Sequence, residues 1–71
     1  MQTSTIMTIG TALDRAMTGG FPVTILIGAS SIDGEVAQYD GTGAVLRHSI
    51  AGEDHLTVVR VEAINAVTFR Q

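Results

Sequence analysis

The apolar residues of this chain change their spacing at Gly19–Gly20, and this change limits the folds open to it. Before the two glycines, apolar residues recur every three or four positions, which is the spacing of one face of a helix. After them, apolar residues recur every second position, as in a strand with one buried face. The residues concerned are Ile6, Ile9, Leu13 and Met17 before the glycines, and Val23, Ile25 and Ile27 after them. The chain is therefore predicted to begin with a short helix and to continue as strands.

The helix is predicted to span Thr5 to Thr18, because glycines follow it and glycine commonly ends a helix. An alternative start is Thr11, since Thr11 to Asp14 has the pattern of a capping box. Gly10 weakens the first half of the longer helix, because glycine disfavours helix interiors.

Five strands are predicted after residue 21, separated by polar or glycine-containing turns. Gly34 lies inside the second strand, where glycine commonly marks a bulge or a sharp bend. The fold class is mainly β, with a strongly bent antiparallel sheet curled into a small barrel. We expect one domain, residues 1–71, with the helix at about 5–18 and the barrel at about 21–70. The strands are expected around 23–27, 32–39 and 44–49, with 56–69 divided near 62–64, and 50–55 as a polar connection.

Size and composition indicate a protein that assembles with copies of itself. The chain has 71 residues and no cysteine, so its core is small and no disulfide supports it. Because 45% of the residues are apolar and only 15% are charged, we expect apolar surface that meets another subunit. The net charge is −3 and lysine is absent, so the basic footprint usual for nucleic-acid binders is missing overall.

No sequence feature indicates a membrane or a secretory protein. No apolar run is long enough to span a bilayer, and the first residues lack the basic start of a secretory signal. We therefore expect a cytoplasmic protein.

The glycines of Asp40–Gly43 admit two interpretations, a phosphate-binding loop or a turn. A dinucleotide loop needs a third glycine, where this chain has Leu46, and a helix directly afterwards. Strand-like residues follow instead, so a turn is favoured. An aspartate in a turn commonly accepts bonds from nearby backbone, and we expect this role for Asp40.

No set of residues predicts a catalytic, metal or cofactor site. Asp33 and Glu35 share one strand face, but calcium loops need more oxygen ligands at closer spacing. His48 and His55 are expected to face each other across a hairpin as exposed residues, and two histidines make a weak metal site. Neither histidine belongs to a recognisable catalytic triad, so we do not expect an enzyme.

Arg47 and Arg60 are expected on the third and fourth strands, where they can be neighbours. One interpretation is a pair of solvated charges bonded to Glu35 or Glu62. The other is a pair of cations that grip phosphate or stack on a base. The residues alone favour the first interpretation.

The segment from about residue 12 to residue 69 resembles the Sm-like (LSm) family, and most of all its bacterial branch, Hfq. Residues 21–27, "FPVTILI", are similar to the first Hfq strand. Gly34, Val36, Tyr39 and Asp40 follow the core of the first Sm motif. The pair Ala63–Ile64 matches the "AI" pair near the final Hfq strands.

This resemblance implies a five-stranded barrel that joins edge to edge into a hexamer-like ring and binds single-stranded RNA. Candidate RNA contacts are Arg60, Arg47, Tyr39 and Arg15. The chain departs from the family at Val61 and Glu62, where Hfq places lysine and histidine. We therefore expect an atypical, weakened RNA site. The alternative is an oligomeric scaffold or protein-interaction module of the same fold that does not bind RNA.

Overall fold

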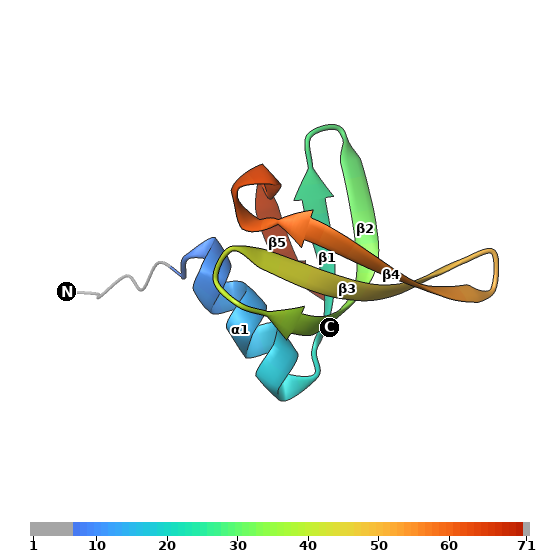
Figure 1. Cartoon of the computed structure of the whole chain (residues 1–71), viewed down its shortest axis with the longest axis horizontal. Helices are drawn as coiled ribbons and strands as arrows, with labels where there is room; N and C mark the ends of the chain where they lie inside the picture. Colours follow the sequence, from blue (N-terminus) through green and yellow to red (C-terminus); the bar gives the residue numbers. More distant parts are fainter. Residues whose placement is uncertain (1–6, 71) are drawn as a thin grey trace.

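The protein forms one helix followed by a five-stranded antiparallel sheet, described here by a computed structural model for residues 7–70 (Figure 1). A single 3₁₀ turn, η1, separates the last two strands. The elements are α1 (Ile9–Gly19), β1 (Pro22–Ile27), β2 (Ser30–Tyr39), β3 (Gly43–Ile50), β4 (Glu53–Arg60), η1 (Val61–Ala63) and β5 (Ala66–Phe69). The predicted fold class, a short N-terminal helix and then a bent five-stranded antiparallel sheet, is confirmed.

The strands lie in the order β4-β3-β2-β1-β5, so β4 and β5 form the two edges of the sheet. All neighbouring strands are antiparallel, and consecutive strands from β1 to β4 are joined by short turns. The sheet curves so that the chain, after β4, turns through η1 and returns to place β5 beside β1 (Figure 1). The predicted division near residues 62–64 is therefore confirmed, because η1 lies there.

Thr8 caps the helix at its N-terminus. The Thr11 backbone N–H donates to the Thr8 Oγ1 atom at 3.0 Å, and regular helix begins at Ile9. The predicted start at Thr5 lies outside the described residues, while the alternative start at Thr11 is wrong because Thr8 supplies the side-chain acceptor first. Gly20 ends the helix in the left-handed conformation with φ 69°, as the glycine pair predicted.

The core lies between α1 and the concave face of the sheet. Its largest fully buried side chains are Leu13, Ile25, Leu46 and Val23. They come from the helix and from two strands, β1 and β3, which is the arrangement that the alternating spacing predicted. In the described part of the chain, no polar or charged residue is buried, so the core is apolar throughout. It is completed by Ala12, Ala16, Val36, Ala44, Val59 and Ile64.

Gly34 lies where β3 crosses close to β2. A Cβ atom added to Gly34 would collide with the Arg47 carbonyl oxygen and lie 2.9 Å from the His48 Cβ atom. Glycine is therefore needed for the bend. The alternative, a bulge at this residue, is wrong: the register shift lies between Val36 and Gln38. The extra residue is Ala37, three positions after Gly34. It allows both Val36 and Tyr39 to pack against the core.

The β3–β4 hairpin is longer than the sequence indicated. The connection is a two-residue turn at Ala51–Gly52, and residues 53–55 belong to β4 rather than to a loop. Pairing of Ile50 with Glu53 and of Ser49 with Asp54 extends the ladder beyond the core. The sequence pattern did not predict the first residues of β4 as strand, because they are polar and mostly exposed and therefore show no alternation of apolar residues.

None of the helical structure in residues 7–70 has the length and apolar character that crossing a membrane requires.

We expect Gly34→Ala to destabilise the fold by about 1–3 kcal/mol, because the new methyl group would overlap the backbone of β3. Chemical denaturation of both proteins measures this difference. Gly43→Ala is the matched control, because the nearest atom to its added Cβ, the Val59 carbonyl oxygen, would lie 3.2 Å away. This contact is tight but does not overlap as the one at Gly34 does. Equal losses for both variants would contradict a special role of Gly34 in the bend.

Candidate nucleic-acid interface

Tyr39 and Arg60, two of the predicted RNA contacts, line one surface hollow of about 500 Å³. We call it the Tyr39–Arg60 hollow. It lies where β2 ends, β3 begins and β4 ends, so antiparallel pairing brings together residues 21 positions apart in sequence. Its lining residues are Gln38, Tyr39, Asp40, Thr42, Gly43, Val45, Val58, Val59 and Arg60.

The Tyr39 ring is half-buried and packs against the hydrophobic core. Its hydroxyl lies against Gly10 of α1 so closely that a Cβ atom at Gly10 would collide with it. The ring thus fixes the start of α1 on the end of β2, and it lies on the core face of the sheet, as do its neighbours Ala44 and Val59. The glycine at position 10, which the sequence marked only as a weak point of the helix, makes room for this contact.

Asp40 organises the β2–β3 turn, as predicted. Its Oδ1 atom accepts hydrogen bonds from the Thr42 N–H at 3.0 Å, the Gly43 N–H at 2.9 Å and the Thr42 hydroxyl at 3.0 Å. These bonds stabilise the charged form, so the Thr42 N–H, followed by the Gly43 N–H, lowers the pKa of Asp40 below its ordinary value. The hollow therefore carries a fixed negative charge at its rim.

Arg60 is exposed and forms an ion pair with Glu62, two residues along the chain. Both side chains are about three-quarters exposed, at 78% and 72%, so the pair is open to solvent and contributes little to stability. It does, however, neutralise the only arginine that lines the hollow.

Arg47 lies away from Arg60, and the prediction that they are neighbours is wrong. In the β3–β4 ladder Arg47 pairs with Leu56, while Arg60 pairs with Gly43. Arg47 lies on β3 and Arg60 on the adjacent strand β4, as the sequence predicted. The two-residue turn between these strands, however, sets a register in which the two arginines are not paired. Arg47 instead lies 3.9 Å from Glu35, as the alternative interpretation expected.

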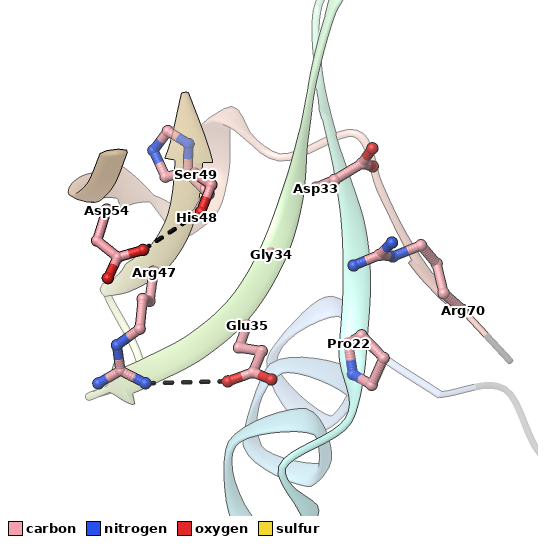
Figure 2. A pocket seen from close by; sticks show the side chains of 9 residues that line it. All are labelled: Pro22, Asp33, Gly34, Glu35, Arg47, His48, Ser49, Asp54 and Arg70. Atoms are coloured by element: carbon pink, nitrogen blue, oxygen red, sulfur yellow. Dashed lines mark hydrogen bonds and ion pairs between the residues drawn. The ribbon is translucent and has the colours of Figure 1, made fainter. Parts of the chain in front are cut away.

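Figure 2 shows a second hollow, of about 440 Å³, on the outer face of the sheet. Most of its charged side chains have protein partners: Thr24 donates to Asp33 at 2.6 Å, Ser49 donates to Asp54 at 3.2 Å, and Arg47 lies 3.9 Å from Glu35. Asp33 and Glu35 thus share a solvated strand face, as predicted, and their oxygens are committed to protein partners. The lining residues are Pro22, Asp33, Gly34, Glu35, Arg47, His48, Ser49, Asp54 and Arg70.

Arg15, the remaining predicted contact, lies on α1 in a third hollow together with Asp14 and Phe21. This third hollow shares no lining residue with the other two hollows. Of the four predicted contacts, only Tyr39 and Arg60 therefore come together in one place.

His48 and His55 face each other across the β3–β4 ladder, as predicted, with ring centroids 6.0 Å apart. The prediction that both are exposed is wrong, because each is half-buried. His48 Nε2 lies 2.6 Å from the Thr57 hydroxyl, and His55 Nε2 lies 3.8 Å from a Glu53 oxygen. Across the range 7–70 no group of three or more histidine, cysteine, aspartate or glutamate residues is placed to hold a metal ion.

The Ala63–Ile64 pair lies in the connection between β4 and β5. Ile64 is 7% exposed and packs into the core, while Ala63 lies in η1 at the surface. Asn65, which the sequence did not single out, follows directly and accepts a hydrogen bond from the Gly28 N–H at 2.5 Å. Gln38, Thr42 and Val58 are further residues of the Tyr39–Arg60 hollow that sequence reasoning missed, because only the pairing register brings them to it.

No protein-family model matches the chain, and no curated protein matches it either.

We expect Asp40→Asn to lower the stability at neutral pH, because the neutral amide is a weaker acceptor for the turn. The pKa of Asp40 is lower in the folded state than in the unfolded state. The ionised carboxylate therefore contributes fully to the free energy of unfolding above the unfolded pKa, near 3.8, and this contribution is lost as the pH falls through the folded pKa. The difference between the two proteins should therefore shrink below about pH 4. Urea denaturation at several pH values measures it.

Asp14→Asn is the control, since Asp14 lies on the exposed face of α1. A stability difference for Asp40→Asn that stays constant down to pH 2 would contradict the charge-based role.

Proposed function

We propose that this protein is an Sm-like, Hfq-type subunit that assembles into a hexamer-like ring in the cytoplasm and binds single-stranded RNA weakly. The observation that carries the RNA proposal is the placement of Tyr39 and Arg60 in one hollow. An aromatic ring and a guanidinium group are the side chains on which unpaired bases and phosphates are bound.

The edges of the sheet support assembly. Val61 N–H bonds to the Thr42 carbonyl, and because antiparallel bonding alternates, Leu56, Val58 and Arg60 direct their backbone groups away from β3. On the other edge, the Arg70 N–H donates to the Pro22 carbonyl. By the same alternation, the backbone N–H and C=O groups of Val67 and Phe69 in β5 point away from β1. Pairing β4 of one copy with β5 of the next satisfies both rows and closes a ring.

The charge distribution makes the proposed RNA binding weak. Each subunit carries a net charge of −3, and Glu62 and Asp40 place carboxylates beside the only arginine of the hollow. Phosphates are repelled by such a ring overall, and binding should fall steeply with salt.

A second candidate function is a ring that serves as a scaffold or protein-interaction module without RNA. The Arg60–Glu62 ion pair favours it, because Glu62 already binds the guanidinium group that an RNA phosphate would need. A stable ring that leaves oligonucleotides unbound would select this candidate.

We expect native mass spectrometry to show a closed oligomer for the wild-type protein. Arg60→Pro should reduce it, because proline removes an edge N–H while suiting the Arg60 φ of −86°. Arg60→Ala is the matched control, since it loses the same side chain but keeps the N–H, and its ring should persist. Equal oligomer populations for the two variants would contradict pairing through the β4 edge.

We expect labelled U-rich or A-rich oligonucleotides to bind weakly at low salt in fluorescence anisotropy. Arg60→Ala should weaken this binding, and Glu62→Gln should tighten it by releasing the Arg60 side chain. Arg15→Ala removes the same charge from a separate surface and should have the smaller effect. No change in anisotropy with either oligonucleotide, at high protein concentration, would rule out the RNA proposal.

A further inference from the structure

The outward side chains of β4 form a row with opposite charges at its two ends. Asp54, Leu56, Val58 and Arg60 are all exposed, whereas the alternate residue Val59 is buried in the core. Leu56 is 66% exposed and Val58 75%, more than any other large apolar side chain in the described chain. Because side chains alternate along a strand, these four residues share one face of the sheet.

The neighbouring strand widens the apolar centre of this row. Val45 of β3 pairs with Val58, and Arg47, bonded to Glu35, pairs with Leu56. The face thus has an apolar centre with charged groups around it, which is the arrangement found in protein interfaces. We call the set Val45, Asp54, Leu56, Val58 and Arg60 the β4 face.

We infer that the β4 face docks against the β4 face of a second copy. When two copies meet about a twofold axis with their β4 strands antiparallel, Asp54 of each lies opposite Arg60 of the other. Leu56 of each then lies opposite Val58 of the other, because the four residues are evenly spaced. The face is therefore complementary to itself in charge and in apolar character, as a twofold interface requires.

This contact is distinct from the proposed ring. Edge pairing uses backbone groups in the plane of the sheet, while the β4 face consists of side chains that stand perpendicular to that plane. Ring closure leaves Leu56 and Val58 facing outward, so face pairing joins subunits of different rings, or joins two monomers into a dimer where no ring forms. Val58 and Arg60 also line the Tyr39–Arg60 hollow, so a docked copy and RNA compete for it.

A charge exchange tests the inference. In a Glu62→Gln background, which frees Arg60 from its own chain, Asp54→Arg and Arg60→Asp each place like charges opposite each other across the twofold axis. Each single variant should weaken concentration-dependent association about tenfold in sedimentation equilibrium. The double variant Asp54→Arg/Arg60→Asp restores opposite charges and should return to within about twofold of the background protein.

The apolar centre provides a second, independent test. Leu56→Ser/Val58→Ser should abolish face pairing without loss of fold, because both side chains are already exposed. Ile50→Ser is the matched control, since Ile50 is also exposed, at 53%, but lies at the hairpin tip outside the β4 face. This variant should associate like the wild type.

Two results would overturn the inference: failure of the double charge exchange to restore association, or unchanged association of the Leu56→Ser/Val58→Ser variant. Both readouts are independent of the ring. If the wild-type protein shows no ring in native mass spectrometry, face pairing still predicts a dimer, and that dimer should be lost in the Leu56→Ser/Val58→Ser variant.

Discussion

The two sheet edges, β4 and β5, carry backbone groups that no other strand in residues 7–70 bonds, and the behaviour of the protein depends on what satisfies them. Bending at Gly34 curls the sheet around a small apolar core, but five short strands leave both edges open. An open edge is a template for another strand. Association with a further copy satisfies it without any added residue, which suits a chain of 71 residues with no cysteine.

The same geometry places the candidate site. Asp40 holds the turn that brings the end of β2 to the end of β4, and Tyr39 is fixed against α1 beside that turn. Arg60 reaches the hollow only because it is the last residue of the edge strand. The proposed assembly and the proposed RNA binding would therefore both use β4: its backbone edge would pair with a neighbouring subunit, its outward side chains would dock on a second copy, and its final residue would contact RNA.

Local patterns in the sequence predicted the local features. The alternation after Gly19–Gly20 placed the strands, the glycines placed the helix end, and Asp40 was recognised as the turn residue. Features that depend on pairing between strands were missed. The two-residue hairpin turn sets the register that separates Arg47 from Arg60, and the helix start depends on which of several threonines provides the cap.

Hydrogen exchange at the β4 edge tests the proposed assembly most directly. The amides of Leu56, Val58 and Arg60 point away from β3, and no other strand in residues 7–70 bonds them, so edge pairing would bond them to a strand of another copy. Edge pairing predicts that these amides exchange quickly in dilute protein and become protected as the concentration rises. Exchange that stays fast at every concentration, while the amides of Thr57 and Val59 remain protected, would contradict assembly through this edge.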